Sequence, residues 1–314
     1  MSDPVFPSIA IVGAGLIGAS IARAAAEYGA AGSVILYDAS DDVRARANGL
    51  GLGAVVDTLA AAVANADCVI LCVPVGALSA VAADAVPHMK TGAILTDVGS
   101  VKGEAAAALA AAGDGRIHII PGHPIAGTEQ SGPEAGFATL FRNTWHILTP
   151  GDDTSPDYLA AVEVLTRFWQ ALGAKVETMD AARHDRVLAI TSHLPHLIAF
   201  NIVATAFDME TVEQGEVVKY SAGGFRDFTR IAASDPVMWR DVFLTNKDAV
   251  LECLGRFSED LAALQRAIRW GDGDMLMREF TRARTIRKAI IDAGQDSGEV
   301  NFGRNPHPER EAEE

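Results

Sequence analysis

A glycine-rich turn near the N-terminus limits the folds open to this chain more than any other feature of its sequence. The apolar residues 8–12 predict a strand, Gly13-Ala-Gly15-Leu-Ile-Gly18 follows at once, and the alanine-rich residues 19–28 predict a helix. A second predicted strand, 33–37, is followed by Asp38, 20 residues past the third glycine. Glycines with this spacing between a strand and a helix are typical of dinucleotide-binding domains, where they let a pyrophosphate approach the backbone at the helix N-terminus. The turn therefore predicts a nucleotide site; the alternative is a glycine turn in an unrelated α/β domain.

The identity of the cofactor is predicted from the acid that follows the second strand. Asp38 is expected to accept hydrogen bonds from the adenosine ribose, and its charge would repel the 2′-phosphate of NADP, so the predicted cofactor is NAD. Arg44 and Arg46 lie near enough in sequence to soften this repulsion. The residues expected to line the cofactor are Gly13, Gly15, Leu16, Ile17, Gly18 and Asp38, with Val73 and Pro74 at the end of a later strand.

Predicted strands and helices alternate as far as residue 180. The continuous apolar run 68–75 is typical of a strand buried on both faces of a parallel sheet. We therefore predict an α/β, doubly wound (Rossmann) N-terminal domain over residues 1–180. Its other predicted strands are 93–97, 116–120, 145–148 and 175–178, and its other predicted helices are 77–86, 103–112 and 157–172.

The segment after Asp180 has no strand pattern. Helical patterns at 181–207, 237–264 and 275–291 predict an all-α C-terminal domain over residues 181–294, and the polar, charged tail 295–314 is predicted to be disordered. The apolar part of the first helix, 187–207, is long enough to suggest a membrane span, but its polar residues make that costly. A helix that is apolar all round is otherwise buried in a core or against another subunit, so we predict a homodimer formed through this domain.

Composition narrows the possible partners and the compartment. A formal net charge of −15 argues against nucleic acid and anionic membrane surfaces as partners. The three cysteines, Cys68, Cys72 and Cys253, form neither a disulfide framework nor a zinc-ligand spacing, so no metal is expected. The N-terminus lacks the charged and apolar regions of a signal peptide, which favours the cytoplasm.

The best candidate for a catalytic base is His123. It follows the predicted strand 116–120 and precedes Pro124, and a residue before proline is driven into an extended conformation. We expect its imidazole to lie at the end of that strand, pointing away from the sheet; the alternative is a surface histidine in a glycine-rich turn. Ser100 follows another strand and is either the N-cap of helix 103–112 or a ligand contact, because ligands gather at strand ends in such sheets.

Three further residues in the helical half could contact a ligand. His193 and His196 are three apart and would share one face of a regular helix, which allows a metal pair, core packing or a hydrogen bond to substrate. Arg230 lies between Phe228 and Ile231, so we expect it to be partly shielded from water. A shielded guanidinium needs a carboxylate, either from the protein or from a ligand.

Taken in order, five segments of the chain resemble the prephenate/arogenate (cyclohexadienyl) dehydrogenases of tyrosine biosynthesis. The similarity extends over about residues 8–290, and the tail has no counterpart in the family. The segments are Gly13-Ala-Gly-Leu-Ile-Gly18, Asp97-Val-Gly-Ser-Val-Lys102, Gly122-His-Pro-Ile-Ala-Gly-Thr-Glu129, Ser192-His-Leu-Pro-His196, and Gly223-Gly-Phe-Arg-Asp-Phe-Thr-Arg-Ile-Ala232 with Asp235-Pro-Val-Met-Trp239.

This resemblance implies an NAD-dependent oxidative decarboxylation of a small dicarboxylate, prephenate or arogenate, by a homodimer. A ring carbon would lose hydride to the nicotinamide while the ring carboxylate leaves as carbon dioxide. It implies that His123 accepts the hydroxyl proton and that Ser100 hydrogen-bonds near the hydroxyl. It also implies substrate-binding roles for His196, Arg230, Glu129, Asp185, Gly223 and Trp239, with Arg230 on a carboxylate, Glu129 and Asp185 in a polar network, and Trp239 reaching the neighbouring subunit.

Two other interpretations stay open at this point. A β-hydroxyacid-type NAD(P) dehydrogenase has the same two-domain plan, but it relies on a lysine in the helical domain, where this chain has His193 and His196. A non-catalytic, nucleotide-sensing protein would need no positioned base at all.

Overall fold

The computed structural model describes residues 3–209 and 222–292 of the 314-residue chain. The predicted disordered tail, 295–314, lies outside the described residues. The chain divides into two compact units, one made of Met1–His193 with Ser234–Val250 and the other of Leu194–Ala233 with Leu251–Glu314. The two units are described separately below.

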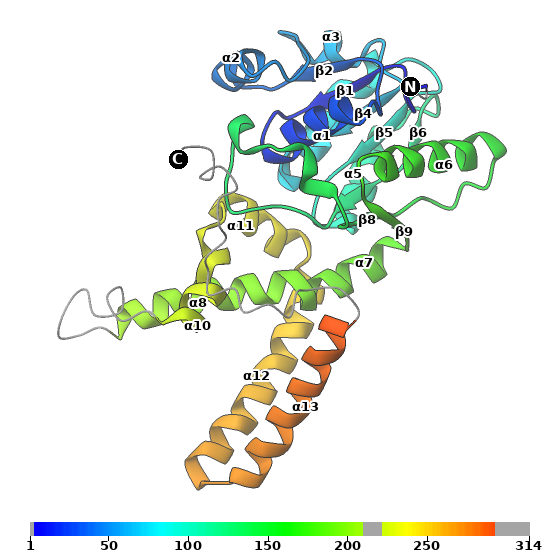
Figure 1. Cartoon of the computed structure of the whole chain (residues 1–314). Helices are drawn as coiled ribbons and strands as arrows, with labels where there is room; N and C mark the ends of the chain where they lie inside the picture. The colour runs from blue at the N-terminus through cyan, green and yellow to red at the C-terminus, as the bar shows by residue number, and fades with distance from the viewer. Residues whose placement is uncertain (1–2, 210–221, 293–314) are drawn as a thin grey trace. The chain divides into compact units, whose positions relative to one another are not determined.

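A six-stranded parallel sheet forms the centre of the first unit (Figure 1). Its order is β3-β2-β1-β4-β5-β6, and every neighbouring pair is parallel. The chain moves outward in one direction from β1 and in the other from β4, so the order reverses between these two strands. This confirms the predicted doubly wound fold, in which ligands bind at that reversal. The strands are β1 (Ile9–Val12), β2 (Val34–Tyr37), β3 (Ala54–Val55), β4 (Cys68–Leu71), β5 (Ile94–Asp97) and β6 (His118–Ile119).

Helices cover both faces of this sheet because its central strands are apolar on both sides. In β1, Ile9 and Ile11 belong to a core shared with helices α1 (Leu16–Glu27) and α6 (Pro156–Ala171). The alternate residues Ala10 and Val12 belong to a second core. The helices of that second core are α3 (Leu59–Val63), α4 (Leu78–Ala85) and α5 (Lys102–Ala112), while α2 (Asp41–Gly49) follows β2.

A second, three-stranded sheet holds the candidate base. Its order is β7-β8-β9, with β7 (Gly122–Pro124) antiparallel to β8 (Trp145–Leu148) and β8 parallel to β9 (Lys175–Thr178). His123 lies inside β7, opposite Ile147. The prediction that it lies at the end of strand 116–120 is therefore wrong: the first sheet's β6 ends at Ile119, and His123 belongs to a new pairing with β8 that begins at Gly122. Two short turns of 3₁₀-helix, η3 (Pro133–Ala135) and η4 (Ala138–Phe141), lie between β7 and β8.

The predicted helix 181–207 is present as one helical run with a wider turn inside it. It consists of α7 (Ala181–Leu188), the π-helical turn η5 (Ala189–His193) and α8 (Leu194–Asp208). Pro195 has no N–H to donate to the preceding turn and its ring crowds a regular α-helical carbonyl, which accounts for the wider turn. By length and composition the run Ala181–Asp208 could span a membrane, with 28% of the most apolar window buried in the structure.

The predicted helix 237–264 is wrong in one respect, because the structure breaks it at Asn246. Helix α11 (Pro236–Thr245) ends there and α12 (Lys247–Trp270) begins directly after it. Asn246 leaves the α-helical conformation at φ −104° and ψ 33°, and its side chain makes two hydrogen bonds to the α7–η5 segment. Helix α13 (Gly273–Asp292) follows, and α10 (Gly223–Thr229) with the 3₁₀ turn η6 (Arg230–Ala233) precedes α11.

The compact units do not follow the predicted domain limits, 1–180 and 181–294. Helix α7, the turn η5 and helix α11 all belong to the unit that contains the nucleotide-binding sheet. The reason is a set of long-range hydrogen bonds: Asp185 binds the backbone at the start of α5, and Asn246 binds the backbone of Asp185. We keep residue 180 only as a proposed boundary between sequence modules.

Candidate active site

The three glycines of the first turn have three different surroundings. Gly13 has φ +102°, and a Cβ there would lie 2.4 Å from the carbonyl oxygen of Cys72 at the end of β4. A Cβ at Gly18 would lie 2.0 Å from the carbonyl oxygen of Gly13, so this glycine lets α1 pack against β1. At Gly15 a Cβ would meet no atom within 4 Å. The first and third glycines are therefore required by packing, and the middle one leaves open backbone at the N-terminus of α1, as a bound pyrophosphate requires.

The other residues expected at the cofactor lie around this turn. Leu16 and Ile17 form the first positions of α1 and are half-buried. Val73 and Pro74 connect β4 to a 3₁₀ turn, η1 (Val75–Ala77), and the Val73 side chain lies 3.3 Å from the position of a Cβ at Gly13. The structure thus brings the predicted residues together at the reversal of strand order between β1 and β4.

Asp38 is held in place by backbone donors. Its Oδ2 accepts a hydrogen bond from Ala14 N at 2.9 Å and its Oδ1 accepts one from Ser40 N at 2.9 Å. The Arg44 guanidinium donates to the backbone oxygen of Asp38 and forms an ion pair with the carboxylate of Asp41. The arginine that was expected to soften the charge of Asp38 is therefore already engaged with another acid. Arg46 is engaged in the same way, with Asp42 and Glu134.

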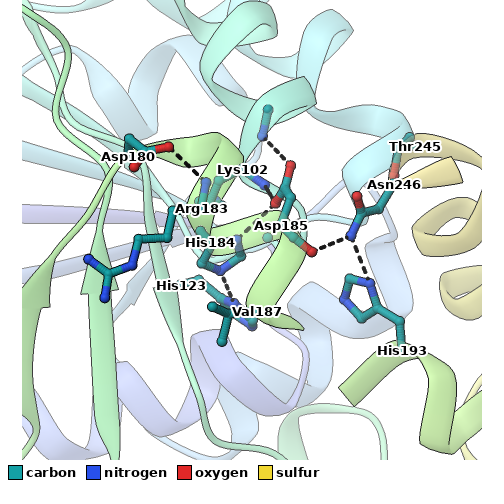
Figure 2. Close-up of polar contacts among 12 residues, drawn as sticks. Lys102, His123, Asp180, Arg183, His184, Asp185, Val187, His193, Thr245 and Asn246 are labelled. Carbon is teal, nitrogen blue, oxygen red and sulfur yellow. Dashed lines mark hydrogen bonds and ion pairs between the residues drawn. The ribbon is translucent and has the colours of Figure 1, made fainter. Parts of the chain in front are cut away.

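His123 is buried, with 8% of its surface exposed, and takes part in a chain of three side chains (Figure 2). Its Nδ1 lies 2.9 Å from His184 Nε2, and His184 Nδ1 lies 2.8 Å from Asp185 Oδ1. Burial lowers the pKa of His123 well below its ordinary value, and the charges that His184 and Lys102 can carry act in the same direction. The imidazole is thus neutral near pH 7 and able to accept a proton.

A buried ion pair fixes the strand that carries His123. Lys102 Nζ lies 2.5 Å from Asp97 Oδ2, both side chains are fully buried, and the same Nζ donates to the Gly122 carbonyl oxygen at 2.7 Å. Asp97 Oδ1 accepts from Gly122 N at 3.2 Å. Burial lowers the pKa of Lys102, while Asp97 favours the charged form. These bonds join the end of β5 and the start of α5 to β7, so the backbone of Gly122 is held just before the candidate base.

Asp185 caps a helix that is distant in sequence. Its Oδ1 accepts from Lys102 N at 2.7 Å and its Oδ2 accepts from Gly103 N at 2.8 Å, at the first turn of α5. Burial alone would raise the pKa of Asp185, but hydrogen bonds from His184 and from these two N–H groups lower it below its ordinary value. The carboxylate is therefore ionised near neutral pH and accepts three hydrogen bonds. These hydrogen bonds place Asp185 in a polar network. They give no evidence for a direct contact between Asp185 and a substrate.

Ser100 does not cap α5. The residue at the N-cap is Val101, which offers no side-chain hydrogen bond, and Asp185 satisfies the first backbone donors instead. The Ser100 side chain is half-buried. The capping alternative for Ser100 is thus wrong, and its hydroxyl is available for another partner.

The two histidines of the long helix have different surroundings. His193 is fully buried: its Nδ1 lies 3.1 Å from Asn246 Nδ2, and Trp239 packs edge-on against its ring at 6.0 Å between centroids. His196 is half-buried and lies in the other compact unit. Because η5 is π-helical, the spacing of a regular helix face does not apply to this pair. Within residues 3–209 and 222–292, no group of three or more His, Cys, Asp or Glu side chains is arranged to hold a metal ion.

One expectation about the substrate residues needs correction. Arg230 is exposed in the single chain rather than shielded; it begins the turn η6, which packs with α10 on α8. Trp239 is 6% exposed and packs within its own chain against His193 and Phe243, and its reach toward a neighbouring subunit stays a prediction. Glu129 is half-buried in the loop after β7, and Gly223 is the first residue of α10.

Four residues of the site were absent from the predicted set. His184 and Asn246 have no local pattern that distinguishes them from polar residues on a helix surface. Asp97 and Lys102 lie within the segment 97–102 that resembles the family, but a lysine is seldom fully buried, so nothing pointed to it as an internal charge. His184 and Asn246 each have a partner 61 residues away, whereas Asp97 and Lys102 pair with each other across 5 residues.

Two family models match this chain, one in each half, and two relatives of known name match most of its length. Residues 21–178 match the family model of the prephenate dehydrogenase nucleotide-binding domain, and residues 180–282 match that of the prephenate dehydrogenase dimerization domain. A cyclohexadienyl dehydrogenase of Zymomonas mobilis is 44% identical over 91% of this chain and 97% of its own length. A prephenate dehydrogenase of Bacillus subtilis is 33% identical over 90% of this chain and 76% of its own.

Solved structures extend the similarity to three dimensions. The prephenate dehydrogenase of Aquifex aeolicus, in complex with hydroxyphenyl propionate and NAD⁺, superimposes with a TM-score of 0.82 at 33% identity, over 92% of this chain and 99% of its own. The arogenate dehydrogenase of Synechocystis has a TM-score of 0.72 at 27% identity, over 90% and 99%. Both halves match in family order and a 44% identical relative is covered almost completely, so the chain belongs to the prephenate dehydrogenase family.

Proposed function

We propose that this chain catalyses the NAD-dependent oxidative decarboxylation of prephenate, arogenate or both, giving 4-hydroxyphenylpyruvate or tyrosine. The observation that carries the proposal is the buried, neutral His123 in a unit that also holds an open dinucleotide turn. The Z. mobilis relative is named a cyclohexadienyl dehydrogenase, and the A. aeolicus structure contains NAD⁺ with an aromatic acid. Both fit this reaction class.

The proposed reaction requires only a few contributions from the protein itself. NAD, when bound, accepts the hydride from the ring carbon that bears the hydroxyl. His123 takes the proton that this hydroxyl loses, and Ser100 hydrogen-bonds to the same oxygen. Aromatisation of the ring supplies much of the driving force as carbon dioxide leaves, so the protein has to orient the substrate, hold a neutral base and bind carboxylates.

Six residues are proposed to act on the substrate. We propose His196, Gly223 and Arg230, with the guanidinium on a carboxylate. We also propose Glu129 and Trp239, while Asp185 acts through its network because its carboxylate oxygens are occupied by three donors. A planar guanidinium offers two parallel donors to one carboxylate, which matters in a chain whose net charge of −15 repels the substrate.

We propose NAD rather than NADP as the cofactor. The Asp38 carboxylate is fixed by Ala14 N and Ser40 N, and the two nearby arginines are engaged with acids, so a 2′-phosphate would meet an uncompensated negative charge. The ratio of kcat/KM for the two cofactors, measured with saturating prephenate, tests this. Equal values for NAD and NADP would contradict it.

One experiment separates the proposed reaction from its rivals. The full chain is incubated with NAD and prephenate, and in parallel with NAD and arogenate, while the absorbance of reduced nicotinamide and the release of carbon dioxide are followed. A cyclohexadienyl dehydrogenase gives both signals in equal amounts with at least one of the two substrates. A β-hydroxyacid-type dehydrogenase gives neither with these substrates, and a nucleotide-sensing protein binds NAD without any turnover.

We further propose a cytoplasmic homodimer. The match of residues 180–282 to a dimerization domain and the apolar, largely exposed helix α8 support the dimer. Cys68, Cys72 and Cys253 are free thiols, and burial raises the pKa of each, which suits inert thiols in a reducing compartment.

A further inference from the structure

The side chains of His123, His184 and Asp185 form a single hydrogen-bonded chain, called here the His–His–Asp chain (Figure 2). It runs from β7 to α7, and its two side-chain contacts measure 2.9 and 2.8 Å. His184 is fully buried between the other two members. Every member belongs to the same compact unit, so the arrangement does not depend on how the two units meet.

The ionised carboxylate of Asp185 constrains where the two histidines carry their protons. This carboxylate can only accept, so His184 must carry a proton on Nδ1. A doubly protonated His184 would donate from Nε2. When His184 carries only the Nδ1 proton, its Nε2 has a lone pair and accepts, so His123 donates from Nδ1. The remaining ring nitrogen of His123, Nε2, is left with its lone pair and without a proton.

We infer that His184, held by Asp185, is a positioning residue that keeps His123 in the tautomer with a basic Nε2. The inference deepens the proposed function and rests on it, because it names the nitrogen atom that would accept the substrate proton. In the reaction, the hydroxyl proton is transferred to Nε2, and the existing Nδ1–H bond to His184 strengthens as His123 becomes an imidazolium. No proton has to leave His184, so Asp185 stays ionised and compensates the new charge across one imidazole ring.

The His–His–Asp chain also explains why a buried histidine pair and a buried carboxylate occur together. A second tautomer of His123, with the proton on Nε2, would place two acceptor lone pairs against each other at 2.9 Å unless His184 gave up its bond to Asp185 or took up a second proton. Asp185 in turn is anchored by two backbone donors of α5, so its carboxylate cannot rotate away without uncapping that helix. The orientation is thus transmitted from a helix N-terminus to the base.

The tautomer can be tested directly on the wild-type chain. NMR of ring-nitrogen-labelled histidine, near neutral pH and with NAD bound, distinguishes a protonated from an unprotonated ring nitrogen. The His123 signals are assigned by their absence in His123→Asn. We expect a protonated Nδ1 and an unprotonated Nε2 at His123; a protonated Nε2 would overturn the inference. This readout holds whether or not prephenate proves to be the substrate, so it separates a failure of the inference from a failure of the proposed function.

A pair of variants tests the consequence for catalysis. His184→Leu keeps a side chain of similar size but removes the acceptor, and His184→Gln retains an amide oxygen that can accept the Nδ1–H of His123. We expect His184→Leu to lower kcat by roughly 10- to 100-fold, part of the contribution of a positioned base, with little change in prephenate KM. His184→Gln should recover at least a part of this loss.

Measurements of folding on the same preparations complete the test. Melting temperature and NAD affinity report whether each variant keeps the nucleotide-binding unit intact. A folded, NAD-binding His184→Leu with wild-type kcat would overturn the inference. Equal loss of kcat in both variants, with His123 still protonated on Nδ1, would also overturn it, since the role would then be packing alone. If His184→Leu does not fold, the tautomer of the wild-type chain decides the question.

Discussion

His123 combines burial, neutrality and a fixed ring orientation, and these are the properties of a general base rather than of a surface histidine. His123→Asn should lower kcat by roughly 10²- to 10⁴-fold, the usual contribution of a positioned base. The KM for prephenate should change little because the hydroxyl proton moves only in the transition state. Steady-state kinetics with NAD and prephenate measure both values, and a kcat close to that of the wild-type chain would remove His123 from this role.

Arg230 is the residue on which the proposed carboxylate contact depends. A charge-assisted hydrogen bond contributes about 1.5–3 kcal/mol, so Arg230→Ala should weaken prephenate binding by roughly 10- to 100-fold. Arg230→Lys should restore charge but not two parallel donors, and so only part of the affinity. NAD affinity should stay constant.

The neighbouring Arg226, an exposed arginine one turn earlier in α10, provides a matched control for lost surface charge. Arg226→Ala should leave the KM for prephenate within about twofold of wild type, as expected when one screened surface charge is lost. If instead Arg230→Ala lowers the melting temperature and leaves the KM unchanged, Arg230 only braces its own helices.

At the scale of single elements, different glycines of the first βα turn serve packing and ligand binding. Gly15→Ala places its methyl group in open space, so the melting temperature of the free chain should hardly change while the Kd for NAD rises. Gly13→Ala should instead destabilise the fold, because the Cβ would lie 2.4 Å from a backbone oxygen and the residue has φ +102°. Thermal melts and NAD titrations of the two variants check this. If both substitutions destabilised the fold equally, the methyl group at residue 15 would not lie in open space.

The cap of α5 should make stability depend on pH in the acid range. Asp185→Asn leaves one oxygen for three donors, so it should lower the free energy of unfolding by about 1–3 kcal/mol. The folded-state pKa of Asp185 lies below its ordinary value. Its stabilising contribution is thus complete above the unfolded pKa of about 3.9 and is lost as the pH falls through the lower, folded-state pKa.

The difference in melting temperature between wild type and Asp185→Asn should therefore shrink in acid. Asp180→Asn is the control, since Asp180 caps only its own helix through Arg183 N at 2.7 Å. Near neutral pH, Asp180→Asn should lower the melting temperature less than Asp185→Asn does, because asparagine is also a good N-cap residue. A difference for Asp185→Asn that stays constant down to the lowest measurable pH would contradict the account.

For the whole molecule, the second unit has more apolar surface than a monomer would be expected to expose. Large apolar side chains that are more than half exposed lie along α12 and α13. They are Leu251, Leu261, Ile268, Trp270, Met277, Phe280 and Ile286. We expect a homodimer with twice the chain mass of 33.0 kDa at micromolar concentration, measured by light scattering. Phe280→Glu should raise the concentration at which the dimer dissociates, whereas a monomeric mass for the wild-type chain would contradict the proposal.

Local patterns in the sequence were sufficient for the nucleotide-binding half. The glycine spacing, the alternation of strands and helices and the position of Asp38 depend on residues close together in the chain, where steric and hydrogen-bonding rules are short-ranged. The same local rules located His123 and the helical run from 181, but they placed His123 at a strand end and continued a helix through Asn246. Both errors came from contacts that local patterns do not contain.

The tertiary structure alone brought together the groups around His123, the proposed base. His184 lies 61 residues from His123, and Asp185 caps a helix 82 and 83 residues earlier. In sequence, Arg183-His-Asp-Arg186 has the composition of a solvated helix face, and nothing in it indicates that His184 and Asp185 are buried. The sequence by itself determined the Rossmann turn and the family. The orientation of the base was decided only by folding, because a hydrogen bond depends on distance and direction in space and not on separation along the chain.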